Sequence, residues 1–174
     1  MNTIDAEKLS RLRELEDREA ITQLIYRFCR VETRGSVEAY LDLFTPDGQH
    51  ETRWSKTWPD ERAGTSRVIQ GHQAMREHVT RLVGLKKTAR RFCSHPQIVV
   101  DGDQATGVMY RIKVDPKGSA PEVTYGRYLD HYRRTADGAW RIDQRVFELA
   151  MEPPEPLSDV NDYVVWDSYK VVVS

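Results

Sequence analysis

The sequence predicts an α+β fold in which helices come first along the chain and an antiparallel β-sheet follows them. Two observations lead to this fold class. The N-terminal part of the 174-residue chain carries apolar residues at helical spacing. The second half consists of segments of strand length that are separated by turns containing glycine. A chain of this length buries the core of one domain and leaves little room for a second.

Residues 5–33 are predicted to form one long helix, or two helices nearly in line. The apolar residues of its C-terminal half recur at helical spacing and form one buried stripe: Ile21, Leu24, Ile25 and Phe28. The stripe continues toward the N-terminus, with a slight drift, through Leu9, Leu12 and Leu15. Ser36 can cap a second helix over residues 36–44.

The next segments alternate between turn, strand and helix signals. Residues 45–48 have the composition of a turn that leads from a helix into a strand, and residues 49–54 are predicted as a short strand. Residues 55–66 are polar and interrupted by Pro59 and Gly64, which indicates a loop or a lid. A third helix is expected over residues 72–84.

From there on the pattern is that of a meander of antiparallel strands. The predicted strands are residues 92–100, 104–114, 122–134 and 139–150. Gly102 and Gly138 mark two of the turns between them. The proline-rich residues 152–156 end the domain, so we expect one domain over residues 1–152. The tail, residues 153–174, turns apolar again and is expected to pack on this domain or on a neighbouring subunit.

Composition excludes several classes of protein. Lys and Arg number 26 against 27 Asp and Glu, so there is no concentrated basic face for a nucleic acid. The apolar runs are too short for a membrane span, and the N-terminus does not have the pattern of a secretory signal. The two cysteines, Cys29 and Cys93, are too few for a disulfide framework and show no metal-ligand spacing. We therefore expect a cytoplasmic protein and no metal site formed by the cysteines.

Glu32 is the first candidate functional residue. It follows Phe28 by four residues and so falls on the apolar stripe. A carboxylate on such a face is costly unless another group pairs with it or uses it. Either Glu32 lies past the last buried turn and is solvated, or the helix carries an acid or base to the mouth of a pocket.

Aromatic residues are candidates for lining that pocket. Tyr26, Tyr110, Tyr125 and Tyr128 can point hydroxyl groups inward, Tyr110 and Tyr128 most readily because each lies in the middle of a predicted strand. The alternative is that they are ordinary aromatic residues of strands and helices. Trp54 and Trp58 can form an apolar wall for a flat ligand, or else belong to an interface or a packed loop.

Charged residues in the strands have a surface role by default. Arg127 and Arg145 are expected to face solvent; an inward position would favour a substrate with a carboxylate or an enolate. The histidines outside residues 92–100 show no spacing typical of metal ligands, and a surface or capping role is expected for each: His50, His72, His78 and His131.

The order of these landmarks resembles the SnoaL-like branch of the nuclear-transport-factor-two-like superfamily. The landmarks are Gly71 and residues within 20–30, 43–47, 100–105, 126–130 and 137–142. The resemblance implies a cone of curved antiparallel sheet closed by the N-terminal helices, a cystatin-like α+β barrel. It says less about function, because this fold carries dehydratases such as scytalone dehydratase, dehydrochlorinases, isomerases, polyketide cyclases and non-catalytic subunits.

The resemblance also points to positions for acid–base chemistry. In dehydratase and dehydrochlorinase relatives, an aspartate near the end of the first helix orients a histidine on the first meander strand, and this histidine removes a proton from the substrate. The aspartate position falls on Glu32, and the histidine position falls on Arg91. Arginine cannot act as a base because it stays protonated. His95 lies four residues further along and can take the histidine role if the register shifts.

Three arrangements of the site follow. In the first, Glu32 and His95 form a carboxylate–imidazole dyad suited to proton abstraction. In the second, Glu32 is the base and Arg91 steadies an oxyanion, although a nearby arginine weakens a carboxylate base. In the third, Glu32 and Arg91 form a buried ion pair and the pocket only binds.

The function expected from this resemblance is that of a lyase or isomerase without cofactor. Its substrate would be a hydrophobic small molecule such as a polyketide, steroid or aromatic intermediate, bound with the help of Tyr26, Trp54, Trp58, Tyr110 and Tyr128. The alternative is a non-catalytic ligand-binding protein or the structural small subunit of a ring-hydroxylating dioxygenase. Self-association into a dimer or trimer is expected, because relatives bury the outer face of the sheet between subunits.

Overall fold

The computed structural model describes residues 3–83, 89–117 and 120–150, and it confirms the α+β class. The predicted tail lies outside these residues. The helices are α1 (Thr3–Arg34), α2 (Val37–Leu41) and α3 (Gly71–Val83). The strands are β1 (Phe44–Trp54), β2 (Ser66–Gln70), β3 (Arg90–Asp101), β4 (Gln104–Lys117), β5 (Ala120–Arg134) and β6 (Trp140–Ala150).

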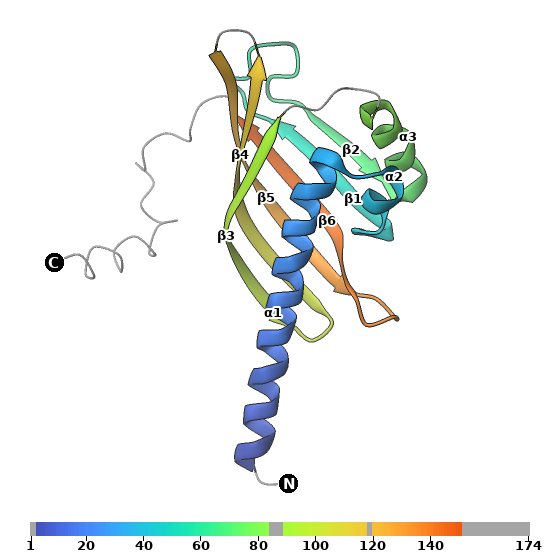
Figure 1. The fold of residues 1–174 in the computed structure, drawn as a ribbon, viewed down its shortest axis with the longest axis vertical. Coiled ribbons are helices and arrows are strands. Elements are labelled where there is room, and N and C mark those ends of the chain that lie inside the picture. The colour runs from blue at the N-terminus through green and yellow to red at the C-terminus, as the bar shows by residue number, and fades with distance from the viewer. Residues whose placement is uncertain (1–2, 84–88, 118–119, 151–174) are drawn as a thin grey trace, which may run out of the picture.

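The strands form one six-stranded sheet in the order β2-β1-β6-β5-β4-β3. The meander β3 to β6 is antiparallel as predicted, whereas β1 pairs with β6 in parallel. The sheet curves around α1, which crosses its concave face, while α2 and α3 lie beside β1 and β2 (Figure 1). Among the described strands, β2 and β3 remain edges, so the curved sheet is not closed into a barrel.

Pairing across the sheet places the inward-facing side chains in rows. One row consists of Cys93, Arg111, Gly126, Leu149 and Trp54. The next consists of Met109, Tyr128, Phe147 and Thr52. A third consists of Gly107, Asp130, Arg145 and His50. Because side chains of a strand alternate between faces, the residues between these rows lie on the convex face.

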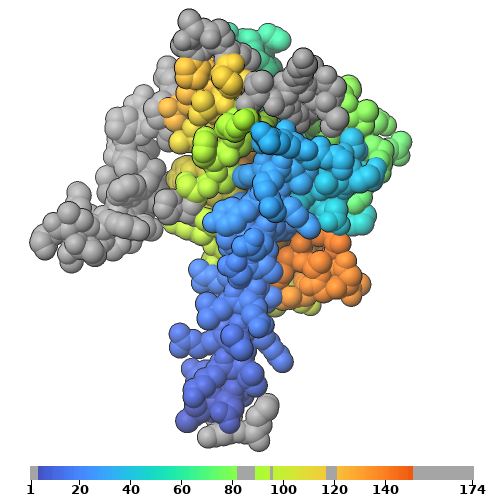
Figure 2. Space-filling view, viewed as in Figure 1, coloured from blue at the N-terminus to red at the C-terminus, as the bar shows by residue number. Residues whose placement is uncertain are grey.

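Helix α1 packs on the sheet through its C-terminal half only. Asp17 marks the point where contact begins: its carboxylate accepts a hydrogen bond from Trp140 Nε1 at 3.0 Å and pairs with Arg134 at 2.6 Å. Before Asp17 the helix projects past the sheet as a stalk (Figure 2), and Leu12 and Leu15 are 51% and 62% exposed. The apolar stripe therefore ends earlier than the sequence pattern indicates, because the sheet does not extend beneath it.

Two segments differ from the predicted elements. Helix α2 ends at Leu41, and β1 already begins at Phe44, through the residues predicted as a turn. Strand β2 was not predicted because its residues are mostly exposed and follow a polar segment; antiparallel hydrogen bonding to β1 holds it at the edge. The predicted turns at Gly102 and Gly138 are confirmed, and both glycines have positive φ angles (60° and 81°) that favour glycine.

The main core lies between the C-terminal half of α1, the short helices and the concave face. Its central side chains are aromatic: Phe28 contacts the rings of Tyr40, Phe44 and Tyr128 at centroid distances of 5.9, 6.3 and 5.7 Å. Within the described ranges, no helix is long and apolar enough to cross a membrane.

Candidate functional site

Glu32 lies on the last turns of α1 and faces the sheet. Its Oε2 is 3.0 Å from Nε of Arg91 on β3, and its Oε1 is 3.6 Å from Nη2 of Arg111 on β4. The three side chains are 23%, 10% and 4% exposed, so Glu32 is not the solvated residue of the first alternative. Arg91 also donates to Thr33 Oγ1 at 3.4 Å. The sequence-predicted pair of Glu32 and Arg91 is therefore formed.

His95 belongs to β3 at an irregularity where the register with β4 shifts between Ser94 and Gln97. Its side chain lies outside what the structure describes. The predicted Glu32–His95 dyad therefore stays a prediction.

The surroundings of Glu32 favour its ionised form. Burial opposes ionisation and raises the pKa of the Glu32 carboxyl group. The charges of Arg111 and then Arg91 lower this pKa by more than burial raises it, so the net pKa lies below the ordinary 4.5. Glu32 is consequently a carboxylate at neutral pH. The two guanidinium groups that keep it ionised also reduce its strength as a base.

His50 on β1 faces the interior, which differs from the surface or capping role expected for it. Its Nδ1 is 2.8 Å from the hydroxyl oxygen of Tyr40, and its ring stacks on Phe44 at 6.0 Å. Its Nε2 is buried and has no hydrogen-bond partner among the described residues. Burial, and next the charge of Arg145, lower the pKa of His50 to about 3, while Glu32 opposes this shift. The imidazole is therefore neutral at physiological pH.

Arg145 on β6 faces inward, so the solvent-facing position expected for it was wrong, whereas Arg127 is exposed as expected. It donates to both carboxylate oxygens of Asp130, at 2.8 and 2.5 Å, and both side chains are fully buried. Its guanidinium lies 3.9 Å from the ring centre of Phe28 and 4.2 Å from that of Tyr128. Tyr132 donates to Asp130 at 2.6 Å. This pair is electrically neutral and enclosed by aromatic rings.

Together these groups give the interior a positive balance. Within the described part of the chain, the ion pairs of Arg91, Arg111 and Arg145 involve two carboxylates, those of Glu32 and Asp130, and His50 adds no charge. Arg111 also lies over Phe147, 4.5 Å from the ring centre. A face with aromatic walls and, among the described residues, more guanidinium groups than carboxylates suits a hydrophobic molecule that carries, or develops, a negative oxygen.

The predicted tyrosines lie in different places. Tyr128 is buried in the interior, 1% exposed, and burial raises the pKa of its phenol. Tyr26 is exposed on α1. Tyr110 lies on the convex face of the sheet, where it lines a groove of about 580 Å³ together with Ile112 and Tyr125. The structure thus brings Tyr128 alone among Tyr26, Tyr110 and Tyr128 into the row beside Arg111.

The predicted tryptophans lie near one another at the end of β1. The guanidinium of Arg62 lies 5.6 Å from the ring of Trp54 and 5.5 Å from that of Trp58. Trp58 donates to Asp60 at 3.3 Å. Trp54 occupies the same row as Arg111, whereas Trp58 belongs to the loop between β1 and β2.

Sequence reasoning did not assign Arg111, His50 or Tyr40 to the candidate site. For the two strand residues a signal was present in the sequence. Arg111 lies two residues after Met109, and His50 lies four residues before Trp54, so each shares a strand face with an apolar residue. In the described ranges, no group of three or more His, Cys, Asp or Glu side chains is placed to hold a metal ion.

The chain was compared with known families and structures. The SnoaL-like domain matches residues 13–146. None of the curated proteins matches. An NTF2-like protein with a cystatin-like fold from Novosphingobium aromaticivorans is 25% identical, with a TM-score of 0.65, over 83% of this chain and 88% of that one.

Two further structures from the same organism share the fold. A candidate scytalone dehydratase is 16% identical, with a TM-score of 0.62, over 79% of this chain and 86% of that one. The beta subunit of a candidate aromatic-ring-hydroxylating dioxygenase is 14% identical, with a TM-score of 0.66, over 80% and 93% of the two chains.

Proposed function

The chain belongs to the SnoaL-like domain family, and on this premise we propose that it is a cofactor-independent lyase or isomerase. Its substrate would be a hydrophobic small molecule, such as a polyketide, steroid or aromatic intermediate, from which it removes a proton next to a carbonyl group. The observation that carries the proposal is the ionised Glu32 held between Arg91 and Arg111 on the aromatic concave face.

Glu32 is the proton acceptor in this proposal. As the C–H bond breaks, its proton passes to a carboxylate oxygen of Glu32, and the electron pair moves toward the carbonyl oxygen, which gives an enolate. Arg91 and Arg111 weaken Glu32 as a base, but the same two charges stabilise the enolate as it forms. Because the net charge of the group is positive, this second effect favours the transition state.

His50 supports the same oxygen as a neutral hydrogen-bond donor. The hydroxyl group of Tyr40 stays protonated, since burial raises its pKa, and we assign it as the donor to Nδ1 of His50. The hydrogen of the imidazole then resides on Nε2, which has no other partner in the described part of the chain. A neutral imidazole can polarise a carbonyl group in this way.

Deuterium exchange tests the proton abstraction without knowledge of the natural substrate. The protein is incubated in D₂O with 2-tetralone, a flat apolar ketone, or with a 3-ketosteroid, and exchange next to the carbonyl is followed by proton NMR. We expect exchange above background on at least one ketone and a loss of roughly 100-fold in Glu32→Gln. Glu14→Gln, an exposed carboxylate on the same helix, serves as the matched control and should exchange like the wild type.

Failure of the wild type to exchange either ketone, or full exchange by Glu32→Gln, would contradict the proposal. The pH profile separates the two catalytic arrangements. With Glu32 as the base, whose pKa is below 4.5, exchange should be flat between about pH 5 and pH 8. A histidine base of ordinary pKa, such as His95 in the predicted dyad, would make the rate fall below about pH 6.5.

A second candidate function is that of a non-catalytic partner subunit, and the convex face favours it. Phe92 and Val99 on β3 are 59% and 68% exposed, and Tyr110 and Ile112 on β4 are exposed as well. An apolar face of this kind is typical of an interface. Light scattering on the protein expressed alone distinguishes the cases: we propose a dimer or trimer of this chain, whereas a subunit that requires a different chain should aggregate or stay monomeric.

A further inference from the structure

The two cysteines meet across the contact between α1 and β3. Sγ of Cys29 is 2.8 Å from Sγ of Cys93, and both are free thiols. A disulfide has a sulfur–sulfur distance of about 2.05 Å, so the sulfurs need to approach by roughly 0.8 Å. Since the elements are already packed together, small rotations of the two side chains suffice for this approach.

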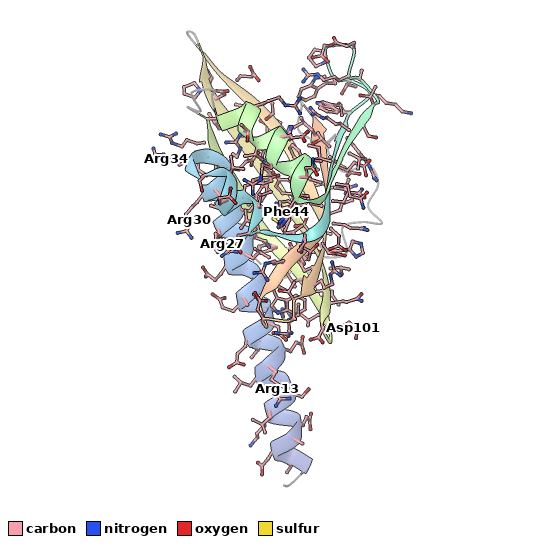
Figure 3. All side chains as sticks on the ribbon, turned by 90° about the vertical axis from the view of Figure 1, so that its right-hand side faces the viewer. Arg13, Arg27, Arg30, Arg34, Phe44 and Asp101 are labelled. Atoms are coloured by element: carbon pink, nitrogen blue, oxygen red, sulfur yellow. The ribbon has the colours of Figure 1, made fainter. Side chains whose placement is uncertain are left out.

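Solvent reaches both thiols. Cys29 and Cys93 are half-buried and line a groove of about 410 Å³ together with Tyr26 and Phe92. Cys29 also lines an adjoining groove of about 560 Å³ at the C-terminal end of α1. Arg30 and Arg34, which Figure 3 shows at this end of the helix, line that groove as well. A small oxidant therefore has access to the pair, in a positively charged setting that favours a thiolate.

The short contact couples the ionisation of the two thiols. A hydrogen bond with Cys93 lowers the pKa of Cys29; burial and Glu32 raise it, Arg145 and Arg111 lower it, and the net shift is downward. The pKa of Cys93 is raised by the same hydrogen bond and by burial. We assign Cys29 as the nucleophile because it lines both grooves, whereas Cys93 lines one of them and is the thiol that reacts second.

We propose that Cys29 and Cys93 are a reversible modification site that a hydroperoxide oxidises to an intramolecular disulfide. The Cys29 thiolate attacks one peroxide oxygen and the O–O bond breaks, which gives a sulfenic acid and, after protonation, one water. Cys93 then attacks the sulfenic sulfur; the S–S bond forms and a second water leaves. The two thiols lose two electrons and two protons, and hydrogen peroxide takes up both.

This disulfide would join the two elements that hold the candidate site. Cys29 precedes Glu32 by one helical turn, and Cys93 follows Arg91 by two residues on β3. The bond would also close a loop that contains α2, β1, β2 and α3, which restricts the unfolded chain. The inference is independent of the proposed catalytic function, since it concerns the thiols alone.

The experiment compares reduced and peroxide-treated wild-type protein, so it requires no substitution that affects folding. Oxidation should lower the intact mass by about 2 Da and remove both alkylatable thiols, and a digest should contain one peptide pair linked through Cys29 and Cys93. The Tm should rise by roughly 5–10 °C and return after treatment with dithiothreitol. In Cys93→Ser, peroxide should leave the Tm unchanged and oxidise Cys29 by addition of oxygen.

Three outcomes would overturn the inference. In the first, both thiols remain alkylatable under peroxide that oxidises free cysteine. In the second, oxygen is added to the wild-type protein without loss of the second thiol. In the third, the disulfide links two chains, which a non-reducing gel shows as a covalent dimer. Because each readout follows the thiols, these results are distinct from a failure of ketone exchange.

Discussion

Two ion-pair clusters lie on the same concave face and differ in how far their charges are compensated. Arg145 and Asp130 form a bidentate pair with no exposed surface, held between two aromatic rings. Glu32 pairs with both Arg91 and Arg111 and retains 23% exposure, so two guanidinium groups share one carboxylate among the residues that the structure describes. The first cluster is closed by the protein itself, whereas the second is near solvent and has charge available for a ligand.

This difference suggests a test that separates charged residues required for folding from charged residues available for function. A buried pair adds little net stability, but removal of one partner leaves an uncompensated charge and is strongly destabilising. At Glu32, which is 23% exposed, replacement of the carboxylate by an amide should be tolerated better, because the amide oxygen can still accept a hydrogen bond. The two clusters should therefore respond oppositely in stability and in activity when their carboxylates are removed.

The largest effect is expected at Asp130. Asp130→Ala leaves the Arg145 guanidinium without its carboxylate at a site with no exposed surface, and should lower the free energy of unfolding by about 3–5 kcal/mol. Denaturation in urea at neutral pH measures this. A loss below about 1 kcal/mol would show that water or another group compensates Arg145, and the contrast between the clusters would fail.

A double variant keeps this test informative if Asp130→Ala does not fold. Asp130→Leu combined with Arg145→Met removes both charges and retains side-chain volume, so it should be clearly more stable than Asp130→Ala. The matched surface control is Asp47→Ala, which removes an exposed partner of Arg133 and should change the free energy of unfolding by no more than about 0.5 kcal/mol.

A smaller effect on stability is expected from His50, whose pKa depends on both clusters. Burial and then the charge of Arg145 lower this pKa, and Glu32 raises it. Its pKa falls from 6.5 to about 3 on folding, so the unfolded chain takes up a proton below pH 6.5 and the folded protein does not. Stability should therefore decrease as the pH falls from 6.5 toward 3, with a slope contribution of up to about 1.4 kcal/mol per pH unit.

The measurement is a series of urea denaturations between pH 7 and pH 5. His50→Gln should remove this contribution to the slope, whereas His131→Gln, an exposed histidine on β5, should not. An unchanged slope in His50→Gln would mean that the folded protein protonates the imidazole as readily as the unfolded chain, so burial would not keep His50 neutral below pH 6.5.

Much of the fold could be predicted because it depends on local periodicity. The stripe from Ile21 to Phe28 and the glycine turns define α1 and the meander without information from distant residues. Strand β2 and the early start of β1 could not be predicted this way, since β2 exists through its pairing with β1 rather than through its own pattern.

The candidate site could be predicted from the sequence only in part, for the same reason. The pairing of Glu32 and Arg91 followed from positions in a family pattern and is present. Arg111 and His50 required knowledge of which face each strand residue occupies. That assignment depends on register, and β3 contains an irregularity next to His95 that reverses the alternation locally.

Of the two carboxylates, Glu32 is expected to give the smaller change in stability. This result would distinguish the Glu32 cluster most directly from the Arg145–Asp130 pair. Glu32→Gln keeps the volume of the side chain, and its amide oxygen can still accept a hydrogen bond from Arg91 or Arg111, so the free energy of unfolding should fall by only about 1–2 kcal/mol. Glu14→Gln should change it by less than about 0.5 kcal/mol. If Glu32→Gln were as costly as Asp130→Ala, the outer cluster would be a second structural pair and the binding-only arrangement would be favoured. A small loss of stability together with a large loss of ketone exchange would instead identify Glu32 as a group that the fold can spare and the chemistry cannot.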